Sequence, residues 1–181
     1  SQYLCITAAN ACFDEPKQKL MEYCIENLND LVKVAEEENV ILLLGTVMGM
    51  DSPCNASTPI VLTVDEVAEI IEQIGSSYLA AYADTQVLSI RGESLTDWFD
   101  RLGEKVRLVR FTDGNYNGYR IWGKGVLPAE KLAEEIYRTG FNGLISFQIP
   151  GERYCENPKD AQKQNHFRAL SAWREVMDCQ R

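Results

Sequence analysis

The sequence predicts an α/β protein with about five parallel strands, each followed by a helix. Two short apolar runs, residues 106–111 and 144–149, flank an amphipathic helix predicted over residues 128–139. Apolar runs of this length around a helical period indicate a βαβ unit with a buried parallel sheet. The same alternation recurs along the chain, which implies parallel strands joined by right-handed crossovers.

The first unit of this pattern is a strand predicted over residues 3–9. A helix follows from Asp14-Glu15-Pro16 to about Glu38, because acidic residues and proline favour the first turn of a helix. Three- and four-residue steps give this helix one apolar face, and residues 40–44 predict the second strand. The residues predicted on the apolar face are Leu20, Cys24, Leu28, Leu31 and Ala35.

A long connection, residues 45–62, leads to the second predicted helix. Thr63 and Glu66 form a capping-box sequence at its start. The third strand is predicted over residues 78–83 and ends at Asp84. The buried stripe predicted for this second helix consists of Val67, Ile70, Ile71 and Ile74.

The second half of the chain begins with a shorter helix, which Ser94 caps and Gly103 ends. The strands over residues 106–111 and 144–149 follow, with the helix of residues 128–139 between them. A last helix is predicted from Pro158 toward Asp178. Its predicted packing residues are Ala161, Phe167, Leu170, Trp173 and Val176.

Composition points to one globular domain over residues 1–181, with 45% hydrophobic and 25% charged residues. The formal net charge of -9 argues against nucleic acid or an anionic membrane as a partner. No apolar run approaches the ~20 residues that a membrane span needs. We therefore expect a cytoplasmic protein whose six scattered cysteines are reduced thiols.

Periodicity alone does not distinguish a partial barrel from an open doubly wound sheet, so we turn to sequence motifs. They are residues 102–106, Arg110 followed by Asp113, the Gly-Lys-Gly-Val-Leu-Pro loop of residues 123–128, and Gly-Phe-Asn-Gly at residues 140–143. Together they resemble the sugar phosphate isomerase/epimerase family of xylose-isomerase-like TIM barrels, which includes ketose 3-epimerases and fructoselysine epimerase. The resemblance implies a partial TIM barrel, equivalent to the C-terminal part of a (β/α)8 barrel.

The resemblance covers the chain from Tyr3 to about Trp173, roughly strands four to eight of the family's barrel. A first portion of about a hundred residues, by the usual size of the barrel, is absent. We therefore expect a fragment or truncated form, with Ser1 an expression remnant.

Family members epimerise a ketose by removing a proton beside a carbonyl and returning it to the other face. The resemblance implies Mn²⁺ or Mg²⁺ held by two Glu, an Asp and a His, with the two Glu residues also moving the protons. Those four positions fall on Gly45, Asp84, Arg110 and Gln148, so only Asp84 keeps its family type, and a further family His falls on Val87. We expect no bound metal, because these cations prefer several anionic oxygens.

The resemblance also supplies candidate ligand contacts. Asp51 and Arg120 match residues that contact substrate, and Gln148 and Trp122 are candidates to bind sugar hydroxyls or stack on a sugar. A turn residue at Asp51, a solvated cation at Arg120 and core packing of Trp122 are the structural alternatives. The only histidine, His166, lies on the last predicted helix, and we expect no function for it.

Arg110 is predicted to pair with Asp84 and fill the former metal position, since an Arg that ends a buried strand is costly unless it is paired. The alternative is a guanidinium that reaches solvent.

These residues predict an isomerase/epimerase-family protein that is inactive as this chain, whose partner is a small sugar or sugar phosphate. The alternative is a non-catalytic carbohydrate-binding or regulatory relative. A nuclease of the endonuclease IV type is discarded, because its zinc site needs many histidines and a basic surface. Five parallel strands also leave two open sheet edges, which predicts a homodimer.

Overall fold

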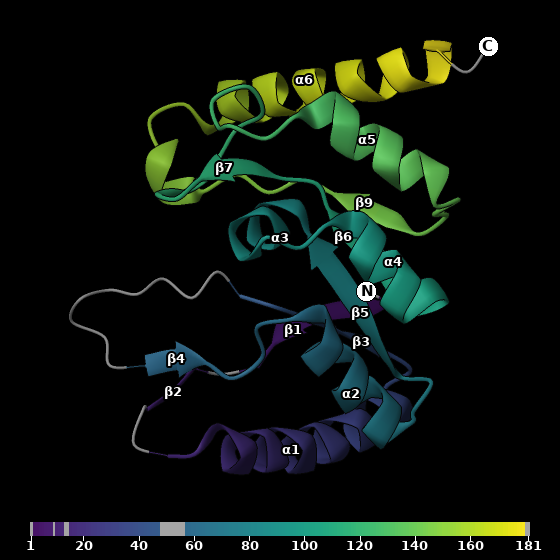
Figure 1. Ribbon diagram of the computed structural model, residues 1–181. Helices are drawn as coiled ribbons and strands as arrows, with labels where there is room; N and C mark the ends of the chain where they lie inside the picture. The colour runs from purple at the N-terminus through teal and green to yellow at the C-terminus, as the bar shows by residue number, and fades with distance from the viewer. Residues whose placement is uncertain (1, 9, 13–14, 48–56, 180–181) are drawn as a thin grey trace. The chain divides into compact units, whose positions relative to one another are not determined.

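The computed structural model describes residues 2–8, 10–12, 15–47 and 57–179 (Figure 1). Asp51, one of the candidate ligand contacts, lies outside these described residues. The chain divides into two compact units, one of residues 1–83 with 100–107 and the other of residues 84–99 with 108–181.

Five strands form one sheet in the order in which they occur along the chain. They are β1 (Tyr3–Thr7), β3 (Ile41–Gly45), β5 (Leu79–Asp84), β6 (Val106–Arg110) and β9 (Leu144–Ser146). β1 pairs with β3, β3 with β5 and β6 with β9, and all three pairings are parallel. A sequential order without reversal excludes the doubly wound sheet, whose strand order reverses at a switch point. The prediction of an α/β fold with five parallel strands is confirmed.

In the first unit, α1 (Lys17–Glu37) and α2 (Val64–Ile74) accompany β1, β3 and β5. The predicted capping box of α2 is present, because Thr63 Oγ1 accepts the Glu66 N–H and the Glu66 side chain accepts the Thr63 N–H. Its predicted stripe is buried at Val67, Ile70 and Ile71. On α1 the predicted face is correct at Leu28 and Ala35 but wrong at Leu31, which is half-exposed while Val32 is buried.

The connection after β3 contains a strand that the sequence pattern did not predict. β4 (Ser57–Pro59) pairs antiparallel with β2 (Asn10–Cys12) in a separate two-stranded sheet. Strands of three residues, one of them ending in proline, carry no apolar period that a pattern could detect.

The second unit holds several elements besides β6 and β9. They are α3 (Thr85–Arg91), most of α4 (Leu95–Leu102), the hairpin strands β7 (Asp113–Asn115) and β8 (Gly118–Arg120), α5 (Ala129–Arg138), the 3₁₀ turn η2 (Gly151–Arg153) and α6 (Pro158–Cys179). Another 3₁₀ turn, η1 (Gly103–Lys105), precedes β6 in the first unit. The sequence analysis predicted α4, α5 and α6 but missed α3 and the hairpin.

α6 packs against α5, and most residues that α6 buries are small rather than the large ones predicted. The prediction is correct for Ala161 and Val176, which are buried, but wrong for Phe167, which is 71% exposed, and for Leu170. Ala169 and Ala172 are buried completely. Small side chains let the two helices approach closely, so the buried face of α6 has little of the hydrophobic periodicity that marks a packing stripe.

The core of the second unit is aromatic. Phe111 is fully buried and stacks on Trp122, with ring centroids 4.4 Å apart, while Trp173 and Phe147 lie at 6.1 and 6.3 Å. Phe111 follows β6 directly, so the cluster fixes the backbone where the polar residues of the site begin.

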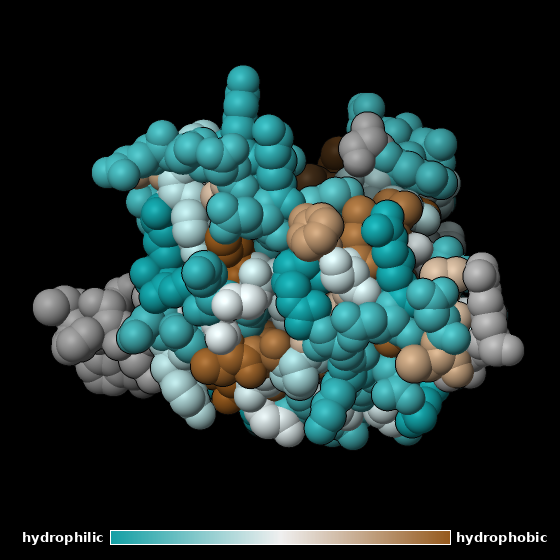
Figure 2. Space-filling view, turned by 90° about the horizontal axis from the view of Figure 1, so that it is seen from above, coloured by the Kyte–Doolittle hydropathy of each residue, from teal (hydrophilic) through white to brown (hydrophobic). Residues whose placement is uncertain are grey.

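The surface seen in Figure 2 is largely hydrophilic, with small and separated apolar areas, as a net charge of -9 would lead one to expect. Among the described helices, none has the length and apolar character needed to cross a bilayer. Four of the cysteines are free thiols, namely Cys5, Cys24, Cys155 and Cys179.

Candidate functional site

The polar centre of the second unit is Asp84, the last residue of β5. Its side chain is only 2% exposed and caps the N-terminus of α3 by accepting the N–H groups of Gln86 and Val87. An aspartate at the carboxyl end of a buried strand is thus held by the helix that follows it. The sequence analysis read this residue as a retained metal ligand and did not foresee the cap.

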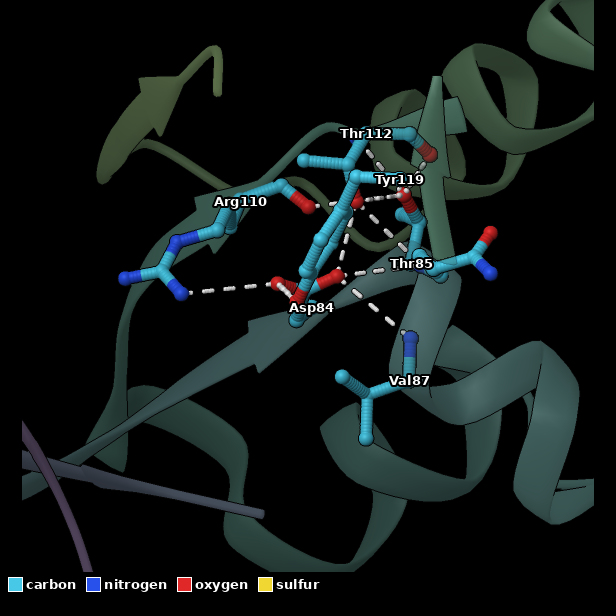
Figure 3. Close-up of polar contacts among 7 residues, drawn as sticks. Asp84, Thr85, Val87, Arg110, Thr112 and Tyr119 are labelled. Carbon is cyan, nitrogen blue, oxygen red and sulfur yellow. Dashed lines mark hydrogen bonds and ion pairs between the residues drawn. The ribbon is translucent and has the colours of Figure 1, made fainter. Parts of the chain in front are cut away.

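Both carboxylate oxygens of Asp84 are engaged by donors (Figure 3). Oδ1 accepts the Thr112 hydroxyl at 2.7 Å, in addition to the two backbone N–H groups at 3.1 and 3.4 Å. Oδ2 accepts the Tyr119 hydroxyl at 2.8 Å, and Arg110 Nη1 lies 3.5 Å away. A carboxylate offers about four lone-pair sites, so little acceptor capacity remains for any further group.

Burial and the donors act on Asp84 in opposite directions. Burial is the largest effect and raises the pKa of the carboxyl above its usual range. The Thr112 hydroxyl, the charge of Arg110, the Tyr119 hydroxyl and the Val87 N–H each lower the pKa but do not cancel the effect of burial.

Thr85 and Thr112 connect the Asp84 cluster to the strand end. The Thr112 N–H donates to Thr85 Oγ1 at 2.8 Å, and the Thr85 hydroxyl donates to the Thr112 carbonyl at 2.7 Å. Both residues are buried. These reciprocal bonds hold the Thr112 hydroxyl beside Asp84. A single threonine in the sequence carries no pattern that would predict this contact.

Arg110 lies at the end of β6, with 23% of its side chain exposed. Its 3.5 Å distance to Asp84 is that of an ion pair, and Figure 3 shows the guanidinium extending toward the carboxylate from the neighbouring segment. The structure thus brings together the two residues that the sequence analysis paired.

Gly45, which the resemblance aligns with the family's first Glu, lies in the first unit and ends β3. A Cβ placed on Gly45 would overlap the ring of Tyr82, which is itself buried. The space that a longer side chain would need here is taken by an aromatic ring. Tyr82 was a feature that the sequence analysis missed, since it reads as an ordinary strand residue.

The other candidate residues are dispersed. Gln148 lies two residues beyond β9 and is half-buried, and it is not among the groups that hydrogen-bond Asp84. Trp122 is 3% exposed and its indole N–H donates to the Phe111 carbonyl, so its surroundings are those of a core residue rather than of a stacking platform. Val87 is buried in α3, and His166 is exposed on α6.

Arg120 ends β8 and is half-buried. Its Nη1 donates to the Tyr119 carbonyl at 3.1 Å, and the side chain lines a cavity that also borders the first turns of α6. This bond links Arg120 to Tyr119, whose hydroxyl donates to Asp84.

A second buried carboxylate, Asp113, shapes the loop that follows the hairpin. Oδ1 accepts the N–H groups of Gly114 and Leu127 at 2.7 and 3.1 Å, and Oδ2 accepts those of Gly123 and Gly125, both at 2.9 Å. The close approach explains the glycine at 125, where a Cβ would overlap the Asp113 carboxylate. The sequence analysis used Asp113 only as part of a motif.

These positions do not fit a divalent metal. Gly45 has no ligand atom, Arg110 is a cation, and the oxygens of the one retained carboxylate are already hydrogen-bonded. In the part of the chain that the structure describes, no three His, Cys, Asp or Glu residues are grouped in a way that could hold a metal ion.

Comparison with known proteins gives the same family over nearly the whole chain. Residues 4–173 match the model of the xylose isomerase-like TIM barrel family. The chain is 26% identical over 174 residues to fructoselysine 3-epimerase of Escherichia coli O157:H7, covering 93% of this chain and 60% of that enzyme. It is 25% identical over 119 residues to D-psicose 3-epimerase of Enterocloster bolteae, covering 66% of this chain and 36% of that enzyme.

Solved structures show the same fold. A D-tagatose 3-epimerase-like protein superposes with a TM-score of 0.80 at 16% identity, covering 100% of this chain and 65% of that chain. The IOLI protein with a bound zinc atom superposes with a TM-score of 0.78 at 14% identity, covering 97% and 64%. The chain thus spans about 60% of the curated relative's length, and its five βα units form a partial TIM barrel.

Proposed function

The chain belongs to the xylose isomerase-like TIM barrel family, and we propose that the protein described here has lost the metal-assisted proton transfer of its epimerase relatives. The proposal rests on one observation. The Asp84 carboxylate caps α3 and accepts two hydroxyls and a guanidinium, so it serves as a structural centre.

The residues needed for proton transfer support the same proposal. Epimerisation needs one acid/base group on each face of the substrate carbon. The two corresponding positions hold Gly45 and Gln148, and neither a hydrogen atom nor a neutral amide takes up a proton near neutral pH. This chain therefore lacks both acid/base groups of the ancestral reaction, as well as the ligands for its divalent metal.

Thermal unfolding with added cations tests the loss of the metal. Mn²⁺, Mg²⁺ and Co²⁺ should leave the melting temperature unchanged, since a ligand of the native state would raise it by mass action. Gln148→Glu alone should not create a response, because Asp84 stays engaged and Arg110 stays cationic. A rise of several degrees with micromolar cation would contradict the proposal, as would 3-epimerisation of D-psicose by the purified chain beside an active epimerase control.

The second candidate is a non-catalytic carbohydrate-binding or regulatory relative. Arg120 and Gln148 favour it, because both are half-buried and carry hydrogen-bond donors that suit sugar hydroxyls. Titration of D-psicose and D-fructose followed by amide chemical shifts would test it. Shifts around residue 148 that disappear in Gln148→Ala would support this function, and no saturable shift with either sugar would remove it.

We also propose a homodimer formed through open sheet edges. β1 and β9 stand at the two ends of the strand order, and Leu4 and Leu144 on them are 54% and 52% exposed. Unpaired strand edges beside apolar side chains favour association, most often with two-fold symmetry. Light scattering should give twice the 20.5 kDa chain mass, and Leu4→Lys or Leu144→Lys should reduce it. A 20.5 kDa species in the unmodified chain at micromolar concentration would contradict the dimer.

A further inference from the structure

A cavity of about 540 Å³ lies in the second unit, separate from the Asp84 cluster. It is bordered by the end of β8, the loop before α5, the η2 turn and the first turns of α6. Its volume lies within the range of roughly 300–1,000 Å³ typical of small-molecule sites. No residue that lines it hydrogen-bonds Asp84.

Three cationic side chains line this cavity, namely Arg120, Lys124 and Arg153. Among the described residues none of them has a carboxylate oxygen within ion-pair distance. Arg120 and Arg153 each donate to one backbone carbonyl, that of Tyr119 and that of Asn117, so each guanidinium keeps further N–H donors. Three cations without acidic partners in a chain of net charge -9 are unusual and point to an anionic ligand.

Two acidic side chains, Glu156 and Asp160, also line the cavity. The carboxylate of Asp160 accepts the Asn157 amide at 2.6 Å, and the Asn157 oxygen accepts the Asp160 N–H at 3.3 Å. Asp160 is thus committed to capping α6 at its start. The three cations still outnumber the two carboxylates, so the lining keeps an excess of positive charge.

The backbone that carries Lys124 is fixed in place. Gly123 and Gly125, on either side of it, both donate to the buried Asp113 carboxylate, and the Lys124 N–H closes a turn on the Ile121 carbonyl at 3.0 Å. The Ile121 N–H in turn donates to the Tyr154 hydroxyl on the opposite side of the cavity at 3.2 Å. A site whose backbone is already ordered loses less entropy when it binds a ligand.

We propose that this cavity binds an oxyanion, either a phosphate or a carboxylate group of a small molecule, through Arg120, Lys124 and Arg153. In (β/α)8 barrels phosphate is frequently bound by the loops that follow the last two strands together with a helix N-terminus. Here the cavity lies between the segments that follow β6 and β9, the last two strands of the five-stranded sheet, and borders the start of α6. The proposal goes beyond the loss of metal chemistry and does not depend on it.

The test is a titration of the whole chain with sodium phosphate, and separately with sodium acetate, at constant ionic strength. Amide chemical shifts of Gly123, Gly125 and the first turn of α6 report where the anion binds. Lys124→Ala should weaken phosphate binding about tenfold or more, the loss expected for a charge-assisted hydrogen bond. Lys124→Arg should keep most of the affinity, because it keeps the cation.

Arg174→Ala is the matched control, because it removes one exposed cation of α6 that does not line the cavity. It should leave the affinity for phosphate nearly unchanged. Tighter binding of phosphate than of acetate would assign a phosphate group, and the reverse would assign a carboxylate. Absence of saturable shifts with both anions up to about 10 mM, or equal weakening by Arg174→Ala and Lys124→Ala, would overturn the proposal.

Discussion

Asp84 and Asp113 follow neighbouring strands of the sheet, and both are buried, but they are held by different kinds of donor. The Asp84 carboxylate accepts two hydroxyls, one guanidinium and two backbone N–H groups. The Asp113 carboxylate accepts four backbone N–H groups, and no side chain among the described residues donates to it. The stabilisation of the Asp84 carboxylate therefore depends on which side chains surround it, whereas that of Asp113 depends on the conformation of the backbone around it.

The difference shows two ways in which a buried aspartate near a strand end is stabilised. By the resemblance, Asp84 would have shared a site with metal ligands, and here Arg110, Thr112 and Tyr119 supply donors in the place where a cation would have been. Asp113 needs no such replacement, because backbone donors remain whatever the side chains become. An aspartate at the end of a strand can thus be retained for its structural hydrogen bonds, and its presence alone does not indicate a catalytic role.

The largest effect is expected at Asp113. Asp113→Ala removes the acceptor of four N–H groups and should lower the free energy of unfolding by about 4 kcal/mol. Asp113→Asn keeps the volume and one acceptor oxygen but turns an NH₂ group toward two donors, so its cost should be smaller. Urea unfolding monitored by tryptophan fluorescence would measure both. A loss under about 1 kcal/mol for the alanine variant would show that water replaces the carboxylate easily.

The next effect concerns the pairing of Asp84 and Arg110. Asp84→Ala leaves a partly buried guanidinium without its carboxylate and removes the cap of α3, which should cost on the order of 3 kcal/mol. The double variant Asp84→Asn with Arg110→Met should cost much less than the sum of the single changes. Additive free energies in this double-mutant cycle would mean that Asp84 and Arg110 do not stabilise each other.

A smaller effect is expected at Gly45, the position that the resemblance aligns with a metal-binding Glu of the family. Gly45→Ala would force the buried Tyr82 ring to move and should cost about 1–3 kcal/mol, the usual range for overpacking. Combining it with Tyr82→Ala should cost less than the two changes summed, because the second change removes the overlap. If Gly45→Ala costs the same free energy of unfolding in the unmodified chain and in Tyr82→Ala, the Tyr82 ring does not limit the side chain at position 45.

The sequence predicted the larger features because each carries a repeated signal. Apolar runs gave the five strands, and helical periods and caps gave α1, α2, α4, α5 and α6. α3 was missed because its signal is a single capping residue, Asp84, which the resemblance had already assigned to a metal. Contacts such as Tyr119 with Asp84, 35 residues apart, or Tyr82 with Gly45, depend on packing between segments and leave no local pattern in the chain.

The smallest expected effect is on the pH dependence of stability, and it concerns Asp84. Because the pKa of Asp84 is raised in the folded chain, the folded state binds this proton more tightly than the unfolded state. The resulting stabilisation is present below the ordinary aspartate pKa of about 3.9 and is lost as the pH rises through the folded pKa. The free energy of unfolding should thus fall with rising pH in that window relative to the non-titrating variant Asp84→Asn.

Arg110→Met removes a charge that lowers the pKa of Asp84, so it should extend the window to higher pH. A difference between the unmodified chain and Asp84→Asn that is constant with pH would show that the donors balance burial, and one that grows in favour of the unmodified chain as pH rises would show that they outweigh it. Either result would contradict the prediction.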